Sequence, residues 1–265
     1  MAAIDFDESI FGMDAKALKP PPLRYLLTEG RAVAELGAMV AAAPFLRLCP
    51  KGDGHPVMCL PGLGGPEAST RPLRGFLRRR GYEATGWGQG TNLGLRPGVW
   101  DRMLDRLDTI YARSRRKVSL VGWSLGGIFA REIAKQRPHM VRQVITLGSP
   151  FAGHPRSTHA WRVYELTSGH RAEHPPMVTN LAVAPPVPTT SIYSRSDGVV
   201  AWQGCLNKPH AQAENVEVEG AHCGLGHNPL ALAVIADRLA QADGFWSPWE
   251  RTGWRRMAYP NPNRA

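Results

Sequence analysis

Ser124 is the first candidate for chemistry, because it is the central residue of the pentapeptide Gly122-Trp-Ser-Leu-Gly126. An apolar run over 118–122 precedes it, and Gly126 and Gly127 begin a helical pattern after it. A serine on a sharp strand-to-helix turn has a strained backbone, and only tiny residues fit two positions before and after it. The pattern predicts an exposed nucleophile on a strand–turn–helix unit; a plain glycine-rich turn is the alternative.

A serine hydroxyl needs a base, and histidine titrates near neutral pH. His222 follows a strand predicted over 216–218, in a small-residue loop before the last helix, and is the favoured base. His227 is the alternative, although its His-Asn-Pro context suits a capping or surface role better. Asp197 ends a β-rich run and is the expected acceptor that fixes the histidine tautomer, with a simple Asp-Gly turn as its alternative.

Acyl transfer also needs N–H donors for the oxyanion. We expect one from Leu125, the first helical residue after the serine, and one from Leu63, in the glycine-rich loop 60–65. A phosphate loop or a simple turn is the alternative for that loop, but no Gly-Lys-Ser/Thr follows it, and 86–90 lacks dinucleotide-binding spacing. No cofactor is expected. Trp123 and Leu63 are predicted to line the acyl pocket.

The elements that position these residues alternate between short β-rich runs and longer helical patterns, which predicts an α/β fold with a mostly parallel central sheet flanked by helices. Helices are predicted over 67–80, 99–115, 125–137 and 229–241. The predicted strands cover 57–60, 82–87, 118–122, 141–147, 191–195 and 216–218.

The chain divides into an N-terminal helical arm (1–48), an α/β domain (49–243) with a cap insertion at about 153–189, and a tail (244–265) that packs as a strap or stays mobile. In the arm, one helix is predicted over about 23–40. Its apolar residues recur at helical spacing and are expected to pack on the body, with contact to a membrane surface as the alternative. They are Leu26, Leu27, Val33, Leu36, Met39 and Val40.

Composition excludes several classes of protein. The chain has 265 residues, of which 43% are hydrophobic and 20% charged, which excludes a disordered or collagen-like chain. The longest apolar run, 36–46, is too short to cross a bilayer, and the first twenty residues lack a signal-peptide pattern, so we expect a cytoplasmic protein. The four cysteines have no zinc-site spacing, so no metal is expected. The net charge of +10 is interpreted as solvated faces, not a nucleic-acid site.

Together, these residues resemble the α/β-hydrolase superfamily, in particular its lipase and esterase branch, which includes inositol-deacylase-like proteins. The resemblance covers about residues 55–242. It implies a triad of Ser124, His222 and Asp197, an oxyanion hole from Leu63 and Leu125, and carboxylic ester hydrolysis through an acyl-enzyme. The predicted cap matches the usual insertion site, whereas Pro61-Gly62 departs from the His-Gly of many relatives.

We therefore expect a serine hydrolase acting on a small-molecule ester or lipid, with weak peripheral membrane contact as an open possibility. Two alternatives remain: an acyltransferase with the same triad, and a catalytically idle scaffold that binds anionic lipid or nucleic acid.

Trp161 and Tyr164 in the cap either add apolar wall to the pocket or pack in the core. Cys205 and Cys223 either form a disulfide that steadies the His222 loop or remain free thiols. The sequence indicates no oligomeric state.

Overall fold

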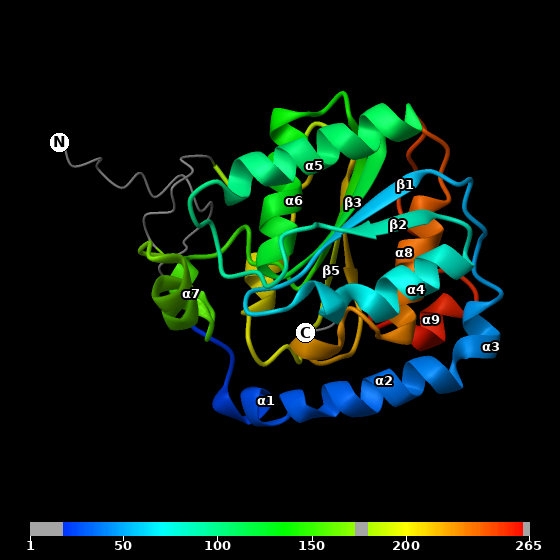
Figure 1. The fold of residues 1–265 in the computed structure, drawn as a ribbon. Coiled ribbons are helices and arrows are strands. Elements are labelled where there is room, and N and C mark those ends of the chain that lie inside the picture. The colour runs from blue at the N-terminus through cyan, green and yellow to red at the C-terminus, as the bar shows by residue number, and fades with distance from the viewer. Residues whose placement is uncertain (1–17, 173–179, 262–265) are drawn as a thin grey trace.

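Six parallel strands form one sheet at the centre of the computed structural model, which describes residues 18–172 and 180–261 (Figure 1). The strand order is β2-β1-β3-β4-β5-β6, and every neighbouring pair is parallel. The predicted α/β class is confirmed. The strands are β1 (Pro56–Leu60), β2 (Glu83–Gly86), β3 (Val118–Trp123), β4 (Val141–Leu147), β5 (Thr189–Tyr193) and β6 (Ala213–Glu217).

Strands β5 and β6 begin two and three residues earlier than expected. Thr189 pairs with Ala213 and Ser191 with Asn215, so the first half of each pairing is formed by small or polar residues. Their backbone hydrogen bonds, not an apolar pattern, place them in the sheet. Hydrophobic periodicity is therefore a poor guide to where these two strands start.

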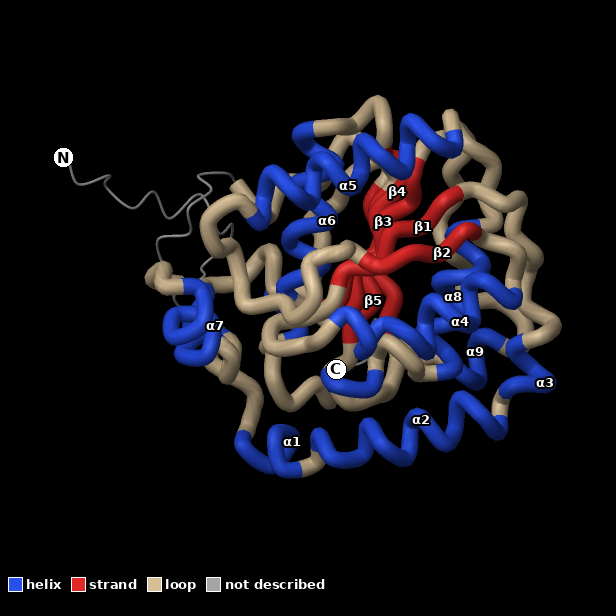
Figure 2. The backbone as a smooth tube through the Cα atoms, viewed as in Figure 1, coloured by secondary structure: helices blue, strands red, loops and turns tan. Residues whose placement is uncertain are grey.

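Helices cover both faces of the sheet, as the tube in Figure 2 shows. Helices α5 (Val99–Ser114) and α6 (Leu125–Gln136) pack on one face, and α4 (Arg71–Arg79) and α8 (Pro229–Leu239) on the other. Each face therefore has its own hydrophobic core. Within β1, Val57 and Cys59 point into the core under α4 and α8, and Met58 and Leu60 point into the core under α5 and α6. A strand buried on both faces reads as a continuous apolar run, which is why β1 is recognisable in the sequence. The helix expected over 67–80 begins as a 3₁₀ turn, η4 (Glu67–Thr70).

From residue 18 on, the N-terminal arm runs along one edge of the molecule, at the bottom of Figure 1. This described part contains four helices: α1 (Leu23–Leu27), η3 (Glu29–Arg31), α2 (Ala32–Ala41) and α3 (Ala43–Leu46). The expected single helix is therefore interrupted near Thr28, whose backbone is not helical.

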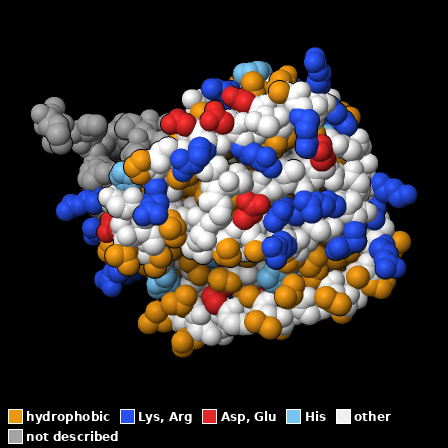
Figure 3. Space-filling view, viewed as in Figure 1, with side chains coloured by type: hydrophobic (Ala, Val, Ile, Leu, Met, Phe, Trp, Pro, Cys, Tyr) orange, Lys and Arg blue, Asp and Glu red, His pale blue; other side chains and the backbone are white. Residues whose placement is uncertain are grey.

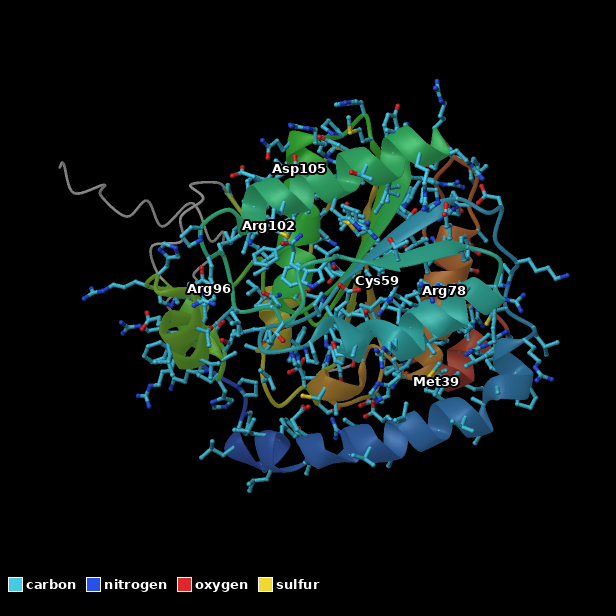
Figure 4. The ribbon with its side chains drawn as sticks, in the orientation of Figure 1. Met39, Cys59, Arg78, Arg96, Arg102 and Asp105 are labelled. Carbon is cyan, nitrogen blue, oxygen red and sulfur yellow. The ribbon has the colours of Figure 1, made fainter. Side chains whose placement is uncertain are left out.

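The expectation that the arm packs through its apolar residues is wrong for most of them. Leu27, Val33 and Val40 are 86%, 78% and 72% exposed. Figure 3 shows a row of hydrophobic side chains along the lower edge of the molecule, where the arm lies in Figure 1. Met39 is buried and joins the core beneath α4 and α8 (Figure 4). The polar side chains of Glu29, Arg31 and Glu35 face the body instead and form hydrogen bonds with it.

The segment between β4 and β5 contains η5 (Pro155–Ser157) and α7 (Trp161–Ser168), and α7 lies beyond the end of the sheet, at the left of Figure 1. Part of the predicted cap, residues 173–179, lies outside the described residues, as do residues 1–17 of the arm and 262–265 of the tail.

The tail packs against the body as far as it is described. It contains α9 (Arg255–Ala258), and the rings of Trp249 and Tyr259 meet edge to face at 4.6 Å between centroids. The Tyr259 hydroxyl donates to the Leu230 carbonyl oxygen on α8 at 3.0 Å. The Arg255 guanidinium also donates to Asp237 on α8, so the described part of the tail, residues 244–261, contacts α8 through both Arg255 and Tyr259. Over the described parts of the chain, no helix combines the length and apolarity that a membrane span requires.

Candidate active site

Ser124 lies on the turn between β3 and α6, with φ 52° and ψ −121°. Among the described non-glycine residues, Arg115 is the other with positive φ. Such a backbone costs on the order of 1–3 kcal/mol and is tolerated where the surroundings enforce it. The Ser124 N–H is anchored to the carbonyl oxygen of Leu147, at the end of β4, at 2.8 Å. The serine is thus held at the carboxyl edge of the sheet.

The two glycines that flank this serine are required by close approaches of the backbone. A Cβ on Gly122 would collide with the backbone of Gly126 and Gly127. A Cβ on Gly126 would lie 2.5 Å from the Leu60 carbonyl oxygen and 2.6 Å from that of Pro61. The pentapeptide therefore brings α6 against both β3 and the loop that follows β1.

Asp197 and His222 form a buried pair beside this turn. His222 Nδ1 lies 2.6 Å from Asp197 Oδ2, and the side chains are 8% and 2% exposed. Asp197 Oδ1 accepts backbone hydrogen bonds from Val199 and Val200, both at 2.8 Å, so the carboxylate is fixed in place. Gly148 packs directly against the pair, because a Cβ there would lie 3.0 Å from His222 Nδ1. Since Gly148 follows the residue that anchors Ser124, one strand end joins all three candidates.

His227, the alternative base, faces another part of the molecule. Its Nε2 lies 2.8 Å from the carbonyl oxygen of Ala32, on α2 of the arm. His222, by contrast, sits in the short helix η7 (His222–Gly224) after β6. The Asp197 carboxylate is therefore paired with His222.

Burial and a neighbouring carboxylate have opposite effects on the pKa of His222. Burial lowers the pKa of its imidazole, but the Asp197 carboxylate, with a smaller contribution from Glu29, outweighs burial and raises the pKa above its ordinary value. With Nδ1 donating to Asp197, the neutral ring has Nε2 free of a proton and able to accept one. The pair is suited to hold an imidazolium during a reaction.

Leu63 and Leu125, the two expected oxyanion donors, both lie next to Ser124. The loop after β1 approaches the serine closely, because a Cβ on Gly62 would lie 3.2 Å from Ser124 Cβ. Leu63, the next residue, and Leu125, the first residue of α6, both line the cavity beside Ser124.

Asn92 braces this loop and has no signal in the sequence. It is fully buried, and its Nδ2 donates to the Pro61 carbonyl oxygen at 2.7 Å. Its own carbonyl oxygen accepts from Gly64 N at 2.7 Å, and its N–H donates to the Gly65 carbonyl oxygen at 3.0 Å. One side chain and its backbone therefore fix the loop at three points.

A mostly apolar cavity opens at Ser124, between the sheet edge and the segment that contains α7. Of the two roles considered for Trp161 and Tyr164, pocket wall or core packing, both residues have the first: from α7 they form part of the cavity wall. Trp123 was expected to line the same pocket, but its ring packs against Gly226 instead. The other lining residues include Leu95, Ile128, Phe129, Pro150, Thr158, Ala160, Leu181 and Val200.

The proposed disulfide is absent, because all four cysteines, each in the described part of the chain, are free thiols. Cys205 is buried with Tyr193 and Val200, whereas Cys223 is exposed. Although part of Cys223 is exposed, the partial burial of its thiol, together with the nearby Glu29 carboxylate, raises the pKa of Cys223 to about 11, so the thiol is protonated at neutral pH.

A second Ser-His-Asp arrangement lies at the opposite end of the sheet. His55 Nδ1 lies 2.5 Å from Asp53 Oδ1, and its Nε2 lies 2.8 Å from Ser119 Oγ. His55 and Ser119 are both fully buried, and Ser119 occupies the regular strand β3. No substrate can reach this hydroxyl, so the arrangement is structural, and it provides a control for Ser124.

Comparisons with known proteins agree with this architecture. A family model described as a PGAP1-like alpha/beta domain matches residues 100–175. No curated protein matches the chain. Lipase B of Aspergillus fumigatus has a similar structure, with a TM-score of 0.56 and 21% identity over 72% of this chain and 53% of that one. The chain thus spans about half the length of that lipase.

Two shorter enzymes are matched over most of their length. Bacillus licheniformis lipase BlEst2 has a TM-score of 0.52 and 18% identity, covering 72% of this chain and 94% of that one. A metagenome-derived lipolytic enzyme described under LipS and LipT has a TM-score of 0.53 and 16% identity, with the same coverage. The sheet order and these likenesses show that the chain has the α/β-hydrolase fold, with lipases and esterases as its structural neighbours.

Proposed function

We propose that the protein is a serine hydrolase of carboxylic esters, with Ser124 as nucleophile, His222 as base and Asp197 as the acid that orients it. The observation that carries this proposal is the buried His222–Asp197 pair, at 2.6 Å, beside a serine with a strained backbone and an open cavity. A buried histidine whose pKa is raised by a carboxylate, next to a cavity that a serine lines, is a candidate site on physical grounds.

The reaction would proceed in two halves. Ser124 Oγ attacks the acyl carbon while His222 Nε2 takes its proton, and the N–H groups of Leu63 and Leu125 stabilise the oxyanion. His222 then protonates the departing alcohol, which leaves an acyl group on Ser124. Water, deprotonated by His222, attacks this acyl-enzyme, and the acid product departs as Ser124 recovers its proton. Asp197 holds the imidazolium in each half.

The apolar wall of the cavity supports an acyl chain as the bound part of the substrate. The row of exposed hydrophobic side chains on the arm supports peripheral contact with a lipid surface, from which such a substrate would come.

The test is hydrolysis of p-nitrophenyl esters of increasing chain length by the wild type, Ser124→Ala and Ser119→Ala. We expect at least about a 10³-fold loss of kcat in Ser124→Ala, because the nucleophile is removed, and nearly normal kcat in Ser119→Ala. A fluorophosphonate should label the wild type and Ser119→Ala but not Ser124→Ala. Activity that survives in Ser124→Ala would disprove the assignment.

The same assay separates the alternatives. Products formed on an added alcohol in place of the free acid would indicate acyl transfer. Ester and fluorophosphonate both left unreacted, together with lipid or nucleic-acid binding that weakens steeply with salt, would indicate an idle scaffold.

A further inference from the structure

Glu29, on η3 of the arm, binds both loops of the proposed triad at once. Its Oε1 accepts the backbone N–H of Gly198 at 2.8 Å and that of His222 at 2.9 Å, and its Oε2 accepts the N–H of Cys223 at 2.9 Å. Gly198 follows Asp197 directly. A single carboxylate from far along the chain therefore joins the loop of the acid to the loop of the base.

Two neighbouring side chains of the arm reinforce this junction. Arg31 donates from Nη2 to the carbonyl oxygens of Ser196, at 2.7 Å, and Gly220, at 2.9 Å, one in each loop. Glu35, one turn further along, accepts the N–H of Ala221 at 2.6 Å. Charge-assisted hydrogen bonds of this kind are stronger than neutral ones.

The arm also lies in direct backbone contact with the acid loop. A Cβ on Gly198 would lie 2.5 Å from the carbonyl carbon of Tyr25 and 2.6 Å from the N of Leu26, both on α1. The absence of a side chain at Gly198 is what allows this approach, so the fit between arm and loop is steric as well as polar.

Glu29 is charged where it lies. Burial raises the pKa of its carboxyl, but the N–H donors of Cys223, His222 and Gly198, with the His222 ring, outweigh burial and lower the pKa. A negative charge is therefore present beside the imidazole at neutral pH.

We propose that Glu29 is a positioning residue of the triad: it fixes the Asp197 and His222 loops relative to each other and stabilises the protonated form of His222. This inference rests on the proposed hydrolase function. Glu29 does not touch the reacting atoms, and it acts through the loops and through its charge.

The charged and titratable groups on the segments packed around His222 are Arg195 and Asp197 on the acid loop, Glu219, Cys223 and His227 on the base loop, and Glu29, Arg31 and Glu35 on the arm. Glu29 is the arm carboxylate whose charge raises the pKa of His222. Glu35 binds the same loop through Ala221 and is therefore a matched control that separates loop anchoring from charge.

The test measures the pH dependence of kcat/KM for a p-nitrophenyl ester with the wild type, Glu29→Gln and Glu35→Gln. Removing the Glu29 charge should lower the pKa of His222, so the acidic limb of the profile should move to lower pH in Glu29→Gln and stay in place in Glu35→Gln. In Glu29→Ala, which also loses the acceptors, kcat should fall about 10-fold or more with KM changed less than about twofold, and Glu29→Gln should recover part of that loss.

An unmoved acidic limb in Glu29→Gln, with the wild type active and labelled by fluorophosphonate, would overturn the role of Glu29 and leave the proposed function standing. If Glu29→Ala does not fold, the acidic limb of the pH profile of Glu29→Gln still tests the role of Glu29. A wild type that neither cleaves the ester nor reacts with the fluorophosphonate would overturn both proposals.

Discussion

The indole Nε1 of Trp123 donates a hydrogen bond to the backbone carbonyl oxygen of His222, at 3.0 Å. Trp123 is the last residue of β3 and immediately precedes Ser124. The segment of the proposed nucleophile is thus tied directly to the segment of the proposed base. This bond gives Trp123 a place in the site that differs from the pocket-lining role expected of it.

Trp123→Phe should lower kcat about 3- to 10-fold with little change in KM, because it keeps an aromatic ring beside Gly226 but removes a hydrogen bond worth about 1 kcal/mol. Steady-state kinetics on a p-nitrophenyl ester measure this. Trp100→Phe is the matched control, since its indole donates to Gln136 on the surface of the helix pair α5 and α6. Equal kcat in both variants would contradict the prediction.

Gly126→Ala should destabilise the protein and reduce its activity. The new methyl group would press on the carbonyl oxygens of Leu60 and Pro61 and displace the loop that carries Leu63. We expect a loss of about 2 kcal/mol or more in the free energy of unfolding, measured by urea denaturation. Gly37→Ala, on α2, has nothing within 4 Å of the added atom and should stabilise the protein by about 0.5–1 kcal/mol. A Gly126→Ala variant as stable as the wild type would refute this packing argument.

His55 should make the protein less stable in mild acid. Burial lowers the pKa of His55 to about 4, below its ordinary value of 6.5. The unfolded chain therefore binds the proton first, and the contribution of neutral His55 is fully present above about pH 6.5 and is lost as the pH falls toward 4. Between pH 7 and pH 5 this amounts to about 2 kcal/mol of unfolding free energy.

Urea denaturation at pH 7 and pH 5 checks this, with His55→Gln as the comparison. The variant should be less stable at pH 7 but should lose about 2 kcal/mol less than the wild type on acidification. His222 contributes with the opposite sign, since its pKa is raised, and the comparison between the two proteins cancels it. Equal losses in both proteins would show that His55 is not responsible.

The arm should bind lipid vesicles through its outer face. A triple variant with Leu27→Ser, Val33→Ser and Val40→Ser loses three exposed apolar side chains. Its binding to phosphatidylcholine vesicles that contain phosphatidylglycerol should be at least about 10-fold weaker. Hydrolysis of a soluble short-chain ester should be unchanged. Met257→Ser, 88% exposed on α9, is the control and should bind normally. Unaltered sedimentation of the triple variant with vesicles would exclude this face.

Periodicity in the sequence predicts the sheet and its helices because β1, β3 and β4 are buried on both faces and their apolar runs are local. The turn at Ser124 is equally local, since its glycines and its serine lie within five residues. The arm is different. Its apolar spacing suggests burial, but the groups that hold it are backbone amides near Gly198 and His222, which no pattern near Glu29 encodes.

Asn92 and the cysteines illustrate the same limit. Nothing around Asn92 marks it as the residue that fixes the loop of Leu63, because its partners come from another part of the chain. The positions of Cys205 and Cys223 next to the acid and base loops suggested a bridge, but one side chain points into a core cluster and the other lies at the surface.

The order of synthesis has a consequence for how this protein matures. Glu29 and Arg31 are synthesised before the amides and carbonyls that they bind, which lie between Ser196 and Cys223, 165 to 194 residues further along the chain. Contacts so distant in sequence form slowly. The hydrophobic outer face of the arm must therefore wait, unattached, until these loops have been synthesised, and chaperone demand during biosynthesis should centre on the arm.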